Sequence, residues 1–198
     1  MRPSLYTLQQ IETPRLILRP VQSGDEIALN KAIRRSLDVL RPWMPWAQDP
    51  SIEATREFIK NGIAARTART LTDFPMVVIH NADRQIIGAS GYNDCSLFDD
   101  GVYDIGYWCD VAYHGHGYAT EYVNALTRYA LGPLQATTVV LRANVMNAKS
   151  IAVAKRLNFM FQGPQPSVTQ EGETDACFVR DSVEGLPPLD VSWHHTDT

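Results

Sequence analysis

YHGHGYATE, residues 113–121, is a turn that contains two glycines and lies between two apolar segments. The run Ile105-Gly106-Tyr107-Trp108 precedes it, and a helical pattern of apolar residues follows it as far as Leu131. Two glycines let the backbone turn tightly, so that several N–H groups can point into one concave spot. The dipole of the following helix places its positive end there as well. This turn therefore predicts a site for a phosphate-bearing cofactor.

A second strand–turn–helix unit follows the first. Residues 138–142 predict a strand, residues 143–150 a polar turn, and residues 151–159 a helix and its exit. Because two such units can face each other across a gap between strands, the pair predicts a slot for a long, thin cofactor arm. A Gly-x-Gly turn alone is more typical of an ordinary strand-to-helix connection. The prediction therefore depends on the two units together.

The motifs in this region resemble those of the GNAT-superfamily N-acetyltransferases. Residues 114–119, His-Gly-His-Gly-Tyr-Ala, are similar to the acetyl-CoA pyrophosphate loop (Gln/Arg)-x-x-Gly-x-(Gly/Ala), with His114 at the first position. Residues 147–159 resemble the second cofactor motif of the superfamily. Residues 13–19 and 40–46 resemble N-terminal segments of the branch of the superfamily that acetylates the N-termini of ribosomal proteins. The resemblance covers roughly residues 11 to 181.

Two positions depart from the family pattern. Many members carry a tyrosine in the last helix that protonates the leaving thiolate, and Ala154 matches that position. In the ribosomal-protein branch a serine takes this role, and Ser150 matches it; its hydroxyl can also simply satisfy N–H groups at the start of a helix. Asn158 replaces a glycine, and Asn accepts the left-handed backbone of a helix C-cap.

The resemblance implies acetyl-CoA as co-substrate and assigns the site residues. Asn147 is expected to hold the pantetheine arm through its amide, and a main-chain N–H between Trp108 and Val111 to polarise the thioester carbonyl. Ser150 and Asp104 are the catalytic candidates, and the loop that carries Trp43 and Trp46 is the candidate substrate wall. The cofactor-binding set is Trp108, Cys109, Asp110, Val111, His114, Gly115, His116, Gly117, Tyr118, Ala119, Thr120, Asn144, Asn147 and Ser150.

The base that accepts the amine proton is open among several carboxylates. Asp104 lies on the strand before the turn, where it can equally be an outward-facing strand residue, and Glu171 and Glu173 lie in a late loop. The α-amine of a peptide has a pKa of about 7.7–8.0, against about 10.4 for lysine, so it needs little help to lose its proton. The sequence offers no conspicuous base, which favours a protein or peptide N-terminus as acceptor.

Three other functions stay open. The protein can acetylate a small amine such as an antibiotic, polyamine or amino acid, or it can be a non-catalytic acyl-CoA-binding domain. A nucleotide-binding protein is disfavoured because no P-loop lysine follows the glycines. A homodimer is possible.

The composition agrees with an ordinary globular protein. The hydrophobic fraction is 44%, the charged fraction 20% and the net charge −4, with no basic block that would indicate a nucleic-acid ligand. Three cysteines without metal or redox spacing predict a reducing compartment and no metal site. No apolar run has the length of a membrane span or a signal peptide, so we expect a cytoplasmic protein.

The element pattern predicts an α+β fold with a single mixed, mostly antiparallel sheet flanked by helices, in one domain over residues 1–198. A strand over 15–21 is followed by a helix that Ser23 and Glu26 begin as a capping box, and by a second helix over about 51–69. Strands over 74–80, 85–92 and 102–110 precede the turn. Beyond the last helix we expect a short strand near Phe161, a polar loop over 165–175, a last strand over 176–180 and a poorly ordered tail over 186–198.

Overall fold

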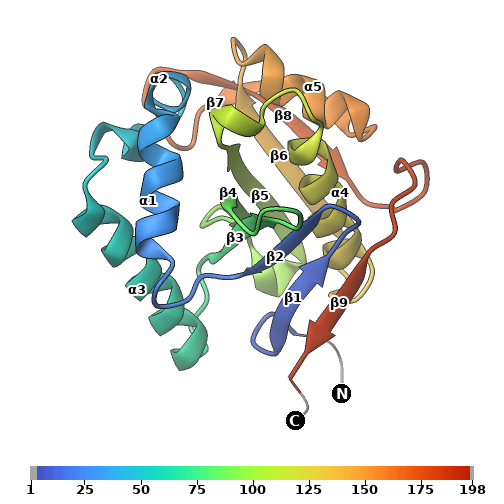
Figure 1. Ribbon diagram of the computed structural model, residues 1–198. Helices are drawn as coiled ribbons and strands as arrows, with labels where there is room; N and C mark the ends of the chain where they lie inside the picture. Colours follow the sequence, from blue (N-terminus) through green and yellow to red (C-terminus); the bar gives the residue numbers. More distant parts are fainter. Residues whose placement is uncertain (1–3, 197–198) are drawn as a thin grey trace.

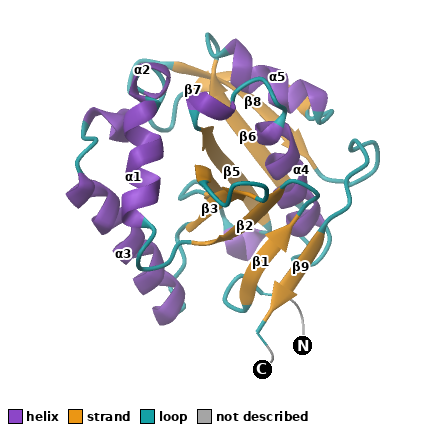
Figure 2. Cartoon of the chain, viewed as in Figure 1, coloured by secondary structure: helices purple, strands orange, loops and turns teal. Residues whose placement is uncertain are grey.

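The computed structural model describes residues 4–196, which form one mixed sheet with helices on both faces (Figures 1 and 2). The strands are β1 (Leu8–Glu12), β2 (Leu16–Pro20), β3 (Phe74–His80), β4 (Ile86–Tyr92), β5 (Val102–Cys109), β6 (Thr138–Asn144), β7 (Met160–Pro166), β8 (Thr174–Arg180) and β9 (Ser192–His195). The helices are α1 (Glu26–Arg35), α2 (Leu37–Leu40), α3 (Ile52–Ala68), α4 (Tyr118–Leu131) and α5 (Ala148–Arg156). Short 3-10 turns lie at η1 (Pro45–Gln48), η2 (Phe98–Asp100) and η3 (Val111–Tyr113).

The sheet has the strand order β7-β8-β6-β5-β4-β3-β2-β1-β9. All neighbouring strands are antiparallel except β5 and β6, which run parallel. The helix α4 supplies the crossover that a parallel pair requires. The predicted mixed, mostly antiparallel sheet is thereby confirmed.

The central strands are buried on both faces, which explains their nearly continuous apolar sequence. On β3, Met76 and Val78 belong to the larger core cluster, whereas Val77 and Ile79 belong to the smaller one. Helices α4 and α5 cover the larger cluster, and α1 and α3 cover the smaller cluster on the opposite face (Figure 1). No helix in the described part of the chain is long and apolar enough to cross a membrane.

The start of helix α1 differs from the prediction. Its N-cap is Asp25, not Ser23, and in the described chain the Asp25 side chain makes no cap hydrogen bond. The Asp25 carboxylate instead accepts from the N–H of Gln22 and pairs with Arg19. Glu26 accepts from the N–H of Gly24. The capping box predicted at Ser23 is therefore wrong, and the acidic pair organises the turn before the helix.

The C-terminal segment also differs from the prediction of a poorly ordered tail. Leu186 is buried in the larger core cluster, and the carbonyl of Pro187 accepts hydrogen bonds from Asn124 and Arg128 on α4. Strand β9 then pairs with β1, and neither of these two strands was predicted. The prediction of a poorly ordered tail is therefore wrong for residues 186–196. Residues 197–198 lie outside the described part of the chain.

Candidate active site

The site begins where the parallel strands β5 and β6 stop pairing. Their register ends at Asp104 and Val140, although β5 continues to Cys109 and β6 to Asn144. The C-terminal part of β5 therefore presents a main-chain edge with no strand partner on the β6 side. An extended ligand arm can lie along such an edge.

The antiparallel pairing with β4 decides which N–H groups face this gap. The N–H of Asp110 donates to the carbonyl of Ile87 at 2.7 Å, so even-numbered residues of β5 bond to β4 and odd-numbered residues face β6. The N–H of Val111 donates to Ser36 Oγ at 3.0 Å. Of the predicted range 108–111, Cys109 alone points its N–H into the gap.

The glycine turn lies beyond the end of β5. Gly115 and Gly117 have φ angles of 82° and 79°, which strain any other L-residue. The first hydrogen bond of α4 joins the N–H of Glu121 to the carbonyl of Gly117. Within residues 4–196, the six main-chain N–H groups from Gly115 to Thr120 have no acceptor. Unsatisfied N–H groups at a helix N-terminus form an anion-binding site.

Arg15 holds this turn from outside. Its guanidinium donates to the carbonyl of His116 at 2.9 Å and lies 4.6 Å from the ring centre of Tyr118. It also pairs with Glu121, in the first turn of α4, at 2.5 Å. The sequence around Arg15 predicts no role for it, because its partners Glu121 and His116 lie about 100 residues further along the chain. The arginine fixes the turn beside Gly117, and Glu121 balances its charge.

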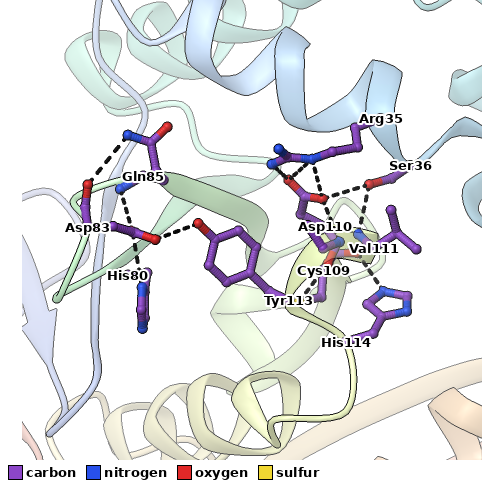
Figure 3. A network of polar contacts seen from close by, with 11 residues as sticks. Arg35, Ser36, His80, Asp83, Gln85, Cys109, Asp110, Val111, Tyr113 and His114 are labelled. Carbon is purple, nitrogen blue, oxygen red and sulfur yellow. Dashed lines mark hydrogen bonds and ion pairs between the residues drawn. The ribbon is translucent and has the colours of Figure 1, made fainter.

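Two tyrosines and two histidines complete the support of the turn, and Figure 3 shows three of them, His80, Tyr113 and His114. Tyr113 donates to Asp83 in the β3–β4 hairpin at 2.6 Å, and His80 lies 2.9 Å from the hydroxyl of Tyr118. His114 directs Nε2 at the carbonyl of Cys109 at 2.9 Å, so this nitrogen carries the proton. The predicted residue His114 therefore ties the turn back to the end of β5.

Asp110 is buried completely and is committed to the protein (Figure 3). Its carboxylate accepts from Arg35 at 2.9 and 3.0 Å and from the N–H of Ala112 at 3.0 Å, with Ser36 at 3.4 Å. The hydrogen bond to Asp110 raises the pKa of Arg35. The pair locks the end of β5 to the end of α1, and the Asp110 side chain cannot contact a cofactor.

Asn147 and Ser150 meet the gap from helix α5. Asn147 is the N-cap, and its Oδ1 accepts from the N–H of Ser150 at 3.1 Å. Only the amide nitrogen of Asn147 is therefore available to a ligand. Ser150 Oγ lies 2.6 Å from the hydroxyl of Tyr107 on β5, a residue for which the sequence analysis assigned no role.

Family models and relatives agree with this architecture. Residues 15–160 match the family model described as an acetyltransferase (GNAT) domain. The chain belongs to the GNAT acetyltransferase family. The Bacillus subtilis (strain 168) protein YdaF, which carries the provisional name of ribosomal N-acetyltransferase, is 28% identical over 159 residues, or 75% of this chain and 79% of YdaF.

Solved GNAT structures share the fold. RimL, a ribosomal L7/L12 α-N-protein acetyltransferase solved with coenzyme A, is 22% identical with a TM-score of 0.78, over 88% of this chain and 99% of RimL. Mycobacterium smegmatis RimJ, solved with a CoA disulfide, is 18% identical with a TM-score of 0.76, over 90% of this chain and 88% of RimJ. At these identities the likeness shows the fold.

The position of Asp104 argues against its predicted role as a base in this acetyltransferase. Its side chain is 1% exposed and forms an ion pair with Arg142 on β6, and it accepts from Asn93 at 2.9 Å. A carboxylate that is buried and paired in this way has no open path to an amine. Asp104 instead joins β5 to β6 at the point where their pairing ends.

Asn144 is also committed elsewhere. Its Oδ1 accepts from the N–H of Met146 at 2.9 Å, and its amide nitrogen donates to Glu173 at 2.9 Å. It therefore orders the polar turn and the late loop, and only the second N–H of its amide nitrogen stays available to a cofactor arm. Glu171 and Glu173 are both exposed.

The tryptophans divide between core and surface. Trp108 is 9% exposed and packs in the smaller core cluster, so only its backbone borders the site. Trp46, on η1, is 44% exposed and packs against Trp108 with ring centres 6.0 Å apart. Trp43 is half-buried. Trp46 therefore fits the predicted substrate wall better than Trp43, because the indole of Trp46 is the more exposed of the two.

Proposed function

We propose that this protein transfers the acetyl group of acetyl-CoA to the α-amine at the N-terminus of a protein or peptide. The observation that carries the proposal is the row of six N–H groups from Gly115 to Thr120 without an acceptor in the described chain. Such a row fits a diphosphate, and Arg15 holds the turn that presents it. The names of YdaF and RimL support the same reaction class.

Acetyl-CoA supplies the acetyl group as a thioester, and the chain supplies groups for both ends of that bond. The N–H of Cys109 donates to the thioester oxygen as negative charge develops on it during attack. The hydroxyl of Ser150 donates to the sulfur as the carbon–sulfur bond breaks. The amide nitrogen of Asn147 donates to the pantetheine arm.

The acceptor is inferred from the ion pair that engages the predicted base Asp104. Because Asp104 is paired with Arg142, the site is suited to an amine that is already partly neutral near pH 7.5. An α-amine with a pKa of about 7.7–8.0 meets this condition, whereas a lysine amine near 10.4 does not. Exposed Glu171 or Glu173 can accept the proton through water, and Trp46 provides an apolar wall for the first acceptor residue.

Acceptor screening tests the proposal. Acetyl-CoA is supplied with peptides that carry a free N-terminus, and release of the CoA thiol is followed. We expect kcat/KM for the best such peptide to exceed that for polyamines, amino acids and aminoglycosides by about tenfold or more, because only the peptide combines a low pKa with a side chain for the Trp46 wall.

The matched control is the same peptide with a blocked N-terminus and an internal lysine, which should be inert. A small amine that outcompetes every free N-terminus contradicts the proposed acceptor. Binding of acetyl-CoA without turnover on any amine favours a non-catalytic domain instead. Calorimetry with CoA alone tests the cofactor site independently of the acceptor.

A cytoplasmic location and a homodimer stay predictions. The former rests on the thiol usage of the sequence, with Cys95, Cys109 and Cys177 unpaired. Sedimentation of the purified chain tests the latter directly.

A further inference from the structure

Tyr107 joins the serine of the proposed site to the core of the protein. Its hydroxyl lies 2.6 Å from Ser150 Oγ and 3.2 Å from the main-chain oxygen of Ser150. It is an odd-numbered residue of β5, on the strand whose free edge borders the gap. Burial raises the pKa of Tyr107 to about 12, so its hydroxyl keeps its hydrogen over the working pH range.

The hydrogens of the two hydroxyls allow two arrangements. In one, Ser150 donates to Tyr107, and Tyr107 donates to the main-chain oxygen of Ser150. The serine hydrogen is then already used and cannot reach a ligand. In the other, Tyr107 donates to Ser150 Oγ, and the serine hydrogen is free to point into the gap. A hydroxyl that accepts one hydrogen bond is also a stronger donor of the next.

We propose that Tyr107 is a positioning residue that donates its hydrogen to Ser150 Oγ and so directs the serine hydrogen at the leaving sulfur. The inference rests on the proposed function, because it needs a thiolate as leaving group. During transfer the carbon–nitrogen bond forms, the carbon–sulfur bond breaks and its electron pair goes to sulfur. The amine releases one proton to solvent and the thiolate takes one up, so neither hydroxyl is consumed.

The surroundings hold Tyr107 in place for this role. Its ring packs edge-on against that of Tyr122 on α4, with ring centres 6.1 Å apart. On the other side, Asn147 fixes the main chain of Ser150 through the helix cap. The serine therefore receives its backbone orientation from Asn147 and its hydroxyl orientation from Tyr107.

A double-mutant cycle tests the inference. The variants are Tyr107→Phe, Ser150→Ala and the double variant, with Tyr103→Phe as control, because Tyr103 lies on the same strand and its hydroxyl has no hydrogen bond within the described residues. Thiol release is measured with the best peptide and also with water as acceptor, so that a readout exists without an amine. We expect Tyr107→Phe to lower kcat about tenfold with little change in KM for acetyl-CoA.

The double variant should be no slower than Ser150→Ala alone, because the tyrosine acts through the serine. An equal loss from Tyr107→Phe in both backgrounds overturns the inference, as does a raised KM with kcat unchanged. Full kcat in Tyr107→Phe beside an impaired Ser150→Ala refutes the tyrosine role alone. Full kcat in Ser150→Ala refutes the serine role in the proposed function, and the tyrosine role with it.

Discussion

Asn147 combines two tasks that substitutions can separate. Its carbonyl oxygen caps α5, and its amide nitrogen is free for the cofactor arm. Asn147→Ser keeps a capping oxygen but removes the amide, whereas Asn147→Ala removes both. We expect both variants to raise KM for acetyl-CoA more than they lower kcat, and only the alanine variant to lose about 1 kcal/mol of unfolding free energy. Steady-state kinetics and urea unfolding measure the two effects.

An unchanged KM in both variants would remove Asn147 from the cofactor site. Equal destabilisation of the serine and alanine variants would contradict the assignment of the cap. The comparison distinguishes a ligand contact from a purely structural role, because the two variants share one change and differ in the other.

At the scale of residues, the sequence predicted groups whose task is local. Gly115 and Gly117 could be predicted because a positive φ angle is a property of the residue itself. Asp104 and Asn144 could not, because each is a polar residue whose partner, Arg142 or Glu173, comes from another segment. The residues next to a carboxylate in the sequence do not show whether it forms an ion pair across a sheet or accepts a proton from a substrate.

The edge strand β9 gives a prediction at the scale of elements. Deletion of residues 191–198 removes β9 and Trp193, whose ring packs against Tyr129 with centres 5.9 Å apart. The outer edge of β1 then loses its partner, and Leu8 and Ile11 lose cover. We expect a drop in melting temperature of about 5 °C or more, measured by calorimetry.

Deletion of residues 197–198 alone is the control, and it should leave the melting temperature unchanged. If the longer deletion also leaves the melting temperature unchanged, β9 contributes nothing to stability and its pairing with β1 is incidental.

Elements could be predicted where their own pattern is long. Helix α3 and strand β3 agree with the predicted ranges 51–69 and 74–80, because their apolar patterns extend over many residues. Strands β1 and β9 have four or five residues each, with polar side chains at several positions. β1 pairs with both β2 and β9, and sequence periodicity contains no signal for the distant pairing of β1 with β9.

The whole molecule should lose stability in alkaline solution. Burial raises the pKa of Cys109 to about 12 and that of Tyr107 to about 12, above their ordinary values near 9 and 10. The unfolded chain therefore releases protons that the folded protein retains, so the free energy of unfolding falls as pH rises. The contribution is fully present below about pH 9 and is lost towards pH 12, with a fall of about 2 kcal/mol from Cys109 between pH 9 and 11.

Urea unfolding at several pH values checks this expectation. Cys109→Ala is the matched variant, and its stability should decline less steeply than that of the wild type over the same interval. Identical slopes for the two proteins would contradict the assignment of Cys109 as a buried thiol that resists ionisation.

The pairing of β1 with β9 joins segments that lie about 180 residues apart in the chain (Figure 1), and the main-chain N–H of Thr196 donates to the carbonyl of Thr7 at 2.9 Å. During translation β1 is therefore made long before its partner β9. At about 5–20 residues per second, the nascent β1 waits on the order of ten seconds or more with an open edge. Until β9 is made, that open edge is a template on which a strand of another copy can pair.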